Sequence, residues 1–284
     1  MGIRLVKDEV VSKVFNNNIV LVNSNDKEKI LFAKGIGFAK KPNEVIPQGT
    51  DVEKVFVIEN KENINDLKYL VDEIDNDFFA VCEEAIYKIS NMIDIELNER
   101  IHIGLVDHLF FAVKRLKNNE EIENPFLIET KTLYPKAYEL AKIVGRIISD
   151  YSSISIPDGE IGFIALHIYS ALNGEKISNT VKNTSLLNEI ACYVEKKIGM
   201  SINKNSLDYA RFSTHVKFAI QRILTNNTVD NDLASIIKKA YKKSYKISEG
   251  VAKIIEENIG VLVTEEEIAC LSIHIERFRV CRKE

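Results

Sequence analysis

Four of the five histidines occupy equivalent places in two copies of one sequence pattern. From the first of these histidines onward the copies align without gaps at one fixed offset, so that His108 corresponds to His215 and His167 to His274. His102 has no counterpart. A single imidazole on a helix face is most often a hydrogen-bonded core residue. Its retention at both equivalent positions indicates that the chemistry of the ring nitrogens matters.

Three chemistries use paired histidines. A metal site needs further ligands, and the nearby carboxylates are Asp107, replaced by Thr214 in the second copy, and the equivalent pair Glu160 and Glu267. Acid–base or nucleophilic hydrolysis needs a positioned nucleophile and an oxyanion site, and neither copy shows their motifs. The third is acceptance of a phosphoryl group by neutral imidazole. Such a modification adds about −1.5 to −2 of charge and can move a domain interface.

The helices that carry the histidines show the same pattern of side chains in both copies. Four residues at positions i, i+3, i+4 and i+7 lie on one helix face. They are His108, Phe111, Ala112 and Arg115 in the first copy and His215, Phe218, Ala219 and Arg222 in the second. We expect the Phe and Ala residues to be core. The arginines are candidates to receive a phosphate on a neighbouring histidine, which would otherwise repel acidic neighbours.

Start signals define the later histidine helix of each copy. Thr264–Glu267 has the sequence of a capping box, and Pro157 to Glu160 occupies the same place in the first copy. A polar stretch from Asn173 to Thr184 separates the copies. These signals predict two all-α helical bundles over residues 61–173 and 174–284.

Residues 1–60 show the sequence pattern of strands rather than helices. Short β-branched runs with polar turns at Asn16–Asn18 and Asn23–Lys27 predict a small antiparallel sheet. The expected strands are Val10 to Phe15, Ile19 to Asn23, Lys29 to Ala33 and Val55 to Ile58. A sheet of this size buries little surface alone, so we expect it to dimerise through its apolar face.

This predicted sheet carries side chains suited to RNA. Asn16 and Asn18 supply amides for base edges, and the run Lys34–Lys41 supplies glycines, an aromatic ring and cations. The same residues also fit an ordinary hairpin with solvated lysines. Residues 1–60 hold 9 Lys and Arg against 8 Asp and Glu, a balance of +1, so strong non-specific electrostatic binding is not expected. The mixture favours a shaped, single-stranded or internally looped RNA.

Composition sets the class of protein. The 284 residues are 45% hydrophobic and 28% charged with a net charge of −4, which predicts a multi-domain globular protein. The longest apolar runs are too short to span a bilayer, and the first residues lack a secretory signal, so a cytoplasmic location is expected. The four cysteines form no CxxC pair. They predict reduced packing residues rather than a disulfide framework or a zinc site, and no cofactor is expected.

Taken together, these motifs resemble the bgl-type transcriptional antiterminators, which join a co-antiterminator RNA-binding domain to two regulation domains (PRDs) of the sugar phosphotransferase system. The resemblance covers the whole chain. It is carried by Lys13 to Asn18, by Gly35 to Lys41 and by Glu53 to Phe56 in the first segment. In the copies it is carried by Asp107–His108 with Glu160–His167 and by His215 with Glu267–His274. The runs from Asn124 to Thr130 and from Leu133 to Lys136, with Ile101–Ile103, look most like the glucose-operon subfamily.

The resemblance implies domains at 1–60, 61–173 and 174–284, and a non-enzymatic homodimer that binds a hairpin in a leader transcript and prevents termination of sugar-uptake genes. It further implies phosphorylation by the sugar permease (enzyme II), mainly on the first PRD, and by the phosphocarrier HPr on the second. The implied phosphoacceptors are His108, His167, His215 and His274, and the implied RNA contacts are Lys13, Asn16, Asn18, Lys34, Gly35 and Phe38.

Two residues depart from the family pattern, and two other functions stay open. Ala39 stands where many members have a larger polar residue or Gly, and Thr214 replaces the acidic residue that precedes His108. A DNA-binding activator with the same regulatory domains would need a helix-turn-helix where strands are predicted. A helical histidine phosphotransfer protein or enzyme would need no RNA affinity in residues 1–60.

Overall fold

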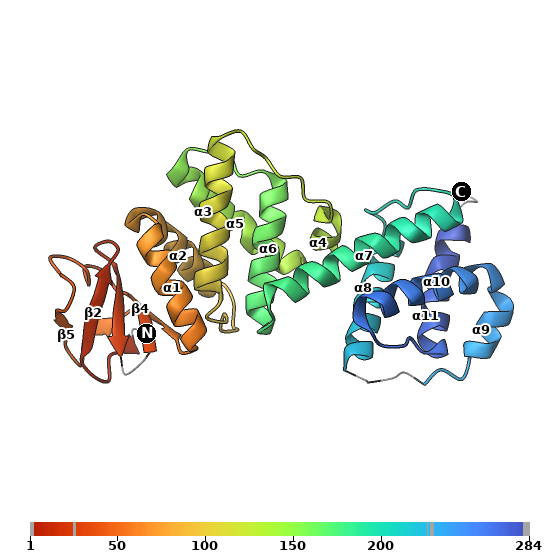
Figure 1. Ribbon diagram of the computed structural model, residues 1–284, viewed down its shortest axis with the longest axis horizontal. Coiled ribbons are helices and arrows are strands. Elements are labelled where there is room, and N and C mark those ends of the chain that lie inside the picture. The colour runs from red at the N-terminus through yellow and green to blue at the C-terminus, as the bar shows by residue number, and fades with distance from the viewer. Residues whose placement is uncertain (1–2, 25–26, 226, 228–229, 281–284) are drawn as a thin grey trace. The chain divides into compact units, whose positions relative to one another are not determined.

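A computed structural model describes residues 3–24, 27–225, 227 and 230–280 of the chain (Figure 1). Cys281 and part of the expected turn at Asn23–Lys27 lie outside these residues. The chain divides into two compact units, one of residues 1–123 and 136–177 and one of residues 124–135 and 178–284. The segment 124–135 lies within the first copy by sequence but belongs to the second unit.

A five-stranded antiparallel sheet with strand order β5-β2-β3-β4-β7 occupies the N-terminal part of the first unit. Its strands are β2 (Glu9–Val14), β3 (Ile19–Ser24), β4 (Lys27–Phe32), β5 (Val45–Ile46) and β7 (Lys54–Ile58), and β1 (Ile3–Arg4) pairs with β6 (Asp51–Val52) in a two-stranded sheet. The four predicted strands are confirmed within two residues at each end. The short strands β1, β5 and β6 were not predicted, since two residues carry no periodic signal.

Both faces of this sheet are buried. On one face Val11, Val20 and Leu31 pack with Leu5 and Ile46 in a small core within the domain. On the other face three aromatic side chains of the β-domain pack on helical residues of the same chain. Phe15 stacks on Phe79 and Phe32 on Tyr87, at ring centroid distances of 4.3 and 5.0 Å, and Phe56 lies tilted against His102 at 4.5 Å. The sheet was expected to dimerise through an apolar face. In the structure, helices of the first unit cover this face.

Five helices complete the first unit: α1 (Lys61–Glu73), α2 (Asn76–Ser90), α3 (Ile101–Lys117), α5 (Pro135–Ser152) and α6 (Asp158–Asn173). Asn60 caps α1, accepting hydrogen bonds from the backbone N–H groups of Glu62 and Asn63. Nδ1 of His102 lies 2.8 Å from a carboxylate oxygen of Glu83, and both side chains are buried. The unduplicated histidine is thus a paired core residue beneath the sheet.

The second unit contains α4 (Leu127–Leu133), α7 (Ile177–Ile198), α8 (Leu207–Leu224), α9 (Ala234–Ala240), α10 (Lys242–Ile259) and α11 (Glu265–Val280). Buried residues of α7, α8, α10 and α11 form one hydrophobic core. The α4 segment is fixed to it by Glu129, whose buried carboxylate accepts hydrogen bonds from Tyr209 at 2.5 Å and Lys204 at 2.8 Å. Among the described residues no helix is long and apolar enough to cross a membrane.

The capping box predicted at the start of α11 forms only in part. Oγ1 of Thr264 accepts from the backbone N–H of Glu267 at 3.4 Å, as expected for an N-cap. The carboxylate of Glu267 does not return to Thr264. It binds Arg222 on α8 instead, so this side chain serves the packing of two helices rather than the helix end.

Candidate phosphoacceptor histidines and RNA interface

The first histidine pair lies between α3 and α6. His108 on α3 and His167 on α6 have ring centroids 5.1 Å apart with an interplanar angle of 31°. Gly104 lies one turn before His108, and a β-carbon on it would stand 3.3 Å from Nδ1 of His167. The absence of a side chain at this position gives the His167 ring room against α3.

A buried carboxylate links this pair to an arginine. Glu160 on α6 is fully buried, accepts a hydrogen bond from Nη2 of Arg115 at 2.9 Å and lies 3.1 Å from Nε2 of His108. Burial acts to raise the pKa of Glu160, but His108 and Arg115 outweigh it, so the pKa is lowered and the carboxylate is charged at neutral pH. Arg115, a candidate to receive a phosphate, is therefore already bound to the Glu160 carboxylate.

The second pair repeats this arrangement between α8 and α11. The rings of His215 and His274 have centroids 4.1 Å apart with an interplanar angle of 32°. Arg222 donates from Nε and Nη2 to the two carboxylate oxygens of Glu267 at 2.5 and 2.7 Å. The contact is bidentate, whereas Arg115 donates to Glu160 from one nitrogen in the first copy.

Three charged residues near the second pair have no equivalent in the first. Arg211 and Arg277 both approach Asp208, at 3.6 and 3.3 Å. At the corresponding positions of the first copy stand Gly104, Ser170 and Ile101. The second pair thus lies in a more cationic setting.

The electrostatics keep imidazoles of both pairs neutral. Burial, with a smaller contribution from His108, lowers the pKa of His167 to about 3. Burial and then His215 lower the pKa of His274 to about 4, and burial and then Arg222 lower the pKa of His215. A neutral ring keeps the lone pair that attacks phosphorus. His215 is exposed and the His108 side chain is 15% exposed, so each pair has one ring partly open to solvent.

The residues flanking the histidines divide into buried and exposed. Ala112 and Ala219 are buried, as predicted. The prediction that Phe111 and Phe218 are core was wrong, since they are 46% and 48% exposed. Both lie one turn beyond a histidine, so each copy presents an aromatic ring to solvent beside its imidazole pair. Helical spacing alone does not separate a core face from the adjoining face of a partner surface.

The predicted RNA contacts fall into two groups. Asn18, Lys34, Gly35 and Phe38 are exposed and come from two adjoining loops, and the Phe38 ring is 71% exposed. Oδ1 of Asn18 accepts from the backbone N–H of Gly35 at 3.0 Å, which joins the loops. Gly35 has φ +75°, a conformation that favours glycine. Together these residues present an amide, a cation and an aromatic ring on one surface.

Lys13 and Asn16 instead contact the first helical domain. Nζ of Lys13 donates to the carbonyl oxygen of Val71 at 2.5 Å and lies 3.8 Å from Asp72. Nδ2 of Asn16 donates to Glu84 at 3.2 Å. These contacts join residues 58 and 68 positions apart in sequence, so no local pattern signals them.

No cluster of three or more metal-ligating side chains occurs among the described residues. Glu160 and Glu267, considered as metal companions from sequence, are each bound to an arginine. Their chemistry is that of a buried ion pair.

A β-domain with an exposed amide, cation and aromatic surface is followed by a duplicated helical unit that pairs histidines, an arrangement suited to a regulated nucleic-acid-binding protein. Comparison with known proteins identifies the family of regulatory proteins to which the chain belongs. The CAT RNA binding domain matches residues 10–65, and the PRD domain matches twice, at residues 83–171 and 188–278. The chain belongs to the family of PRD-containing transcriptional antiterminators with a CAT RNA-binding domain. It is a regulatory RNA-binding protein and not an enzyme.

Relatives in this family align over nearly the whole chain. Protein GlcT of Staphylococcus saprophyticus is 30% identical over 96% of this chain and 98% of its own length. Transcription antiterminator LicT of Bacillus subtilis is 32% identical over 94% of this chain and 98% of its own length. The crystal structure of GlcT CAT-PRDI is 42% identical, with a TM-score of 0.50, and covers 58% of this chain and 98% of that chain.

Proposed function

We propose that this antiterminator binds a hairpin in the leader transcript of sugar-uptake genes, and that His108, His167, His215 and His274 are its phosphoacceptors. The observation that carries the second part is the repeated pairing of imidazoles, each pair held beside a buried Arg–Glu ion pair. Packing alone requires no second ring opposite the first, whereas a regulatory phosphoryl group requires a neutral nucleophile that a donor protein can reach.

The donors of this phosphoryl group are, in the proposal, the enzyme II permease for the first PRD and HPr for the second. The chain acts in the cytoplasm, where both donors meet it, and as a homodimer. The exposed rings of Phe111 and Phe218 beside the histidine pairs support an interface on these faces, because exposed aromatic side chains are favoured at protein contacts.

The ion pairs explain how a phosphoryl group would be sensed. A phosphate on His108 brings about two negative charges next to the buried Glu160 carboxylate, which lies 3.1 Å from the ring nitrogen. The two anions repel each other, and both compete for Arg115. Either Arg115 changes partner or α3 and α6 separate, so the modification acts on the packing of two helices. The same competition for Arg222 applies in the second copy.

RNA binding is assigned to the exposed patch of Asn18, Lys34, Gly35 and Phe38, with Lys13 and Asn16 completing it when the first helical domain is released. Phe38 stacks on an unpaired base and Lys34 contacts phosphate. Since Lys13 and Asn16 donate to Val71 and Glu84 in the structure, RNA and the helical domain compete for these two side chains. A signal that moves α1 and α2 is thereby transmitted to the RNA site.

The test is binding of the full chain to the leader RNA upstream of neighbouring phosphotransferase genes. Phe38→Ala is expected to weaken binding by about 10-fold or more, from the roughly 1–3 kcal/mol of one stacked base. Lys61→Gln, which removes an exposed lysine of α1, is the control and is expected to stay within about two-fold, as for one charge outside the patch. Equal affinity of wild type and Phe38→Ala contradicts the assigned patch.

Phosphorylation is tested separately with the purified phosphotransferase proteins and phosphoenolpyruvate. Each single His→Ala variant is expected to lose label in its own PRD only, as read by mass spectrometry of proteolytic fragments. His102→Gln is a control, since it removes an imidazole that lies outside both pairs while its amide keeps a donor for the buried Glu83. Full labelling of a variant that lacks all four paired histidines would remove the assignment.

A further inference from the structure

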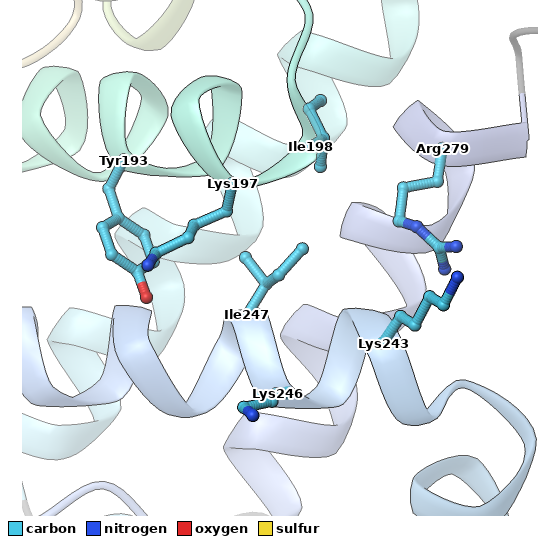
Figure 2. Close-up of a pocket in the computed structure, with 7 residues that line it drawn as sticks. All are labelled: Tyr193, Lys197, Ile198, Lys243, Lys246, Ile247 and Arg279. Atoms are coloured by element: carbon cyan, nitrogen blue, oxygen red, sulfur yellow. The ribbon is translucent and has the colours of Figure 1, made fainter.

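A cavity of about 430 Å³ lies in the second unit between α7, α10 and the end of α11 (Figure 2). It is distinct from the histidine pair, which lies between α8 and α11. Its volume falls in the range of small-molecule sites, roughly 300–1,000 Å³. The lining residues are Tyr193, Lys197, Ile198, Lys243, Lys246, Ile247 and Arg279.

The lining is strongly cationic and contains no carboxylate. Lys197, Lys243 and Lys246 form no ion pair with any described residue, and the one carboxylate partner of the lining is Glu276, which accepts from Arg279 at 2.5 Å. Figure 2 shows the ends of Lys243 and Arg279 pointing toward one another. Glu276 offsets part of the Arg279 charge, and an anion between the two cations would add charge-assisted hydrogen bonds to both.

The cations stand at two ends of an apolar floor. Lys197 and Tyr193 of α7 lie at one end, Lys243 and Arg279 at the other, and Ile247 lies between them (Figure 2). Tyr193 is seated against Gly250 of α10, where an added β-carbon would overlap the tyrosine hydroxyl oxygen. The glycine therefore holds the ring and its hydroxyl group at the cavity.

Part of the positive lining is specific to the second copy, whereas Lys243 has a lysine, Lys136, at its equivalent position in the first. At the equivalent positions of the first copy, Glu139 corresponds to Lys246 and Leu172 to Arg279. The first copy thus lacks these two cations and has a carboxylate in place of one of them.

We propose that this cavity binds a small metabolite with two phosphate groups joined by a sugar, a hexose bisphosphate. Two anionic ends match the two cationic ends, and the sugar ring lies over Ile247 beside the Tyr193 ring. Three helices bound the site, and its volume is that of a small-molecule site. The metabolite would give the second PRD an input besides phosphorylation.

The experiment is titration calorimetry of the unphosphorylated full chain with fructose 1,6-bisphosphate, without RNA. The expected Kd is on the order of 10–100 µM. Fructose 6-phosphate and inorganic phosphate are expected to bind at least about 10-fold more weakly, since each loses one set of charge-assisted bonds, and fructose gives no heat.

Matched variants separate the cavity from the general charge of the unit. Lys197→Gln with Lys243→Gln removes one lysine from each end and is expected to weaken binding by about 10-fold or more. The neighbouring pair, Lys196→Gln with Lys242→Gln, removes the same charge from the same helices outside the lining and is expected to stay within about two-fold. All four lysines are exposed, so the unfolding midpoints should match. Equal loss in both pairs, or no binding by wild type, overturns the proposal and leaves the proposed function untouched.

Discussion

The buried Arg222–Glu267 pair gives a quantitative prediction. Replacing Glu267 by Gln removes the negative charge and leaves the Arg222 guanidinium with an amide oxygen as its acceptor. Removing one partner of a buried ion pair costs about 3–5 kcal/mol. The Arg222 side chain is 28% exposed, so water compensates in part, and the glutamine retains one hydrogen bond. We therefore expect Glu267→Gln to lower the free energy of unfolding of the second unit by about 2–3 kcal/mol.

The first copy supplies an internal comparison. Arg115 makes one hydrogen bond to Glu160, where Arg222 makes two to Glu267. Glu160→Gln is therefore expected to cost about 1–2 kcal/mol. Urea and thermal unfolding followed by circular dichroism measure both costs, and about 2–3 kcal/mol corresponds to a fall in Tm of roughly 5–10 °C in a unit of this size.

Two further variants decide the cause. Glu265→Gln, in an exposed ion pair with Lys238, is expected to change stability by no more than about 0.5 kcal/mol. The double variant Arg222→Leu with Glu267→Leu is expected to recover most of the loss, because an apolar pair leaves no buried charge unpaired. If Glu267→Gln is as stable as Glu265→Gln, the ion pair does not hold α8 against α11 and the proposed sensing of phosphate loses its basis.

Three more predictions follow from single contacts. In Gly37→Ala the new β-carbon would overlap the carbonyl oxygen of Asn16, so we expect a loss of about 2 kcal/mol or more in stability of the sheet, read by urea unfolding, and a matching loss of RNA binding. In the folded protein the pKa of His167 is about 3 and that of His274 is about 4, both below the unfolded value of about 6.5. The unfolded chain therefore binds more protons than the folded chain when the pH is below about 6.5. The free energy of unfolding should fall as the pH drops from about 6.5 toward 4, by up to about 1.4 kcal/mol per pH unit for each histidine. His167→Asn should flatten this acid slope, and an unchanged slope would show that the ring is not buried neutral. Glu84→Gln removes the charged acceptor of the Asn16 side chain. Because a net hydrogen bond is worth about 0.5–1 kcal/mol, RNA affinity should rise roughly two- to five-fold in a gel-shift titration. A fall in affinity would contradict the competition between RNA and α2 for Asn16.

The sequence was sufficient for those features that repeat or alternate. The strands followed from β-branched runs, and the equivalent histidine positions followed from identity at a fixed offset. The contact of the two rings within each copy was not predicted, because the offset relates one copy to the other and carries no information on contacts inside a copy. The ion pair between Arg115 and Glu160 could also have been predicted from the sequence. Both residues are retained in the second copy as Arg222 and Glu267, and retention of opposite charges at two positions is a signal for contact.

Other features had no local signal. The contact of Lys13 with Val71 joins a strand to a helix through a backbone carbonyl, an acceptor that every residue possesses. The exposure of Phe111 depends on which of two adjoining helix faces meets α6, a choice made by tertiary packing. The cationic cavity beside Tyr193 required the ends of three helices to converge.

The membership of residues 124–135 in the second unit bears on how the protein is made. This segment leaves the ribosome before α7 has been synthesised. The groups that satisfy Glu129, the ammonium of Lys204 and the hydroxyl of Tyr209, stand 75 and 80 positions further along the chain. Until they are translated the carboxylate remains in water and α4 has no core to join. The α4 segment therefore gains its buried ion pair and its hydrophobic core only after Tyr209 has been synthesised, although it precedes α5 and α6 in sequence.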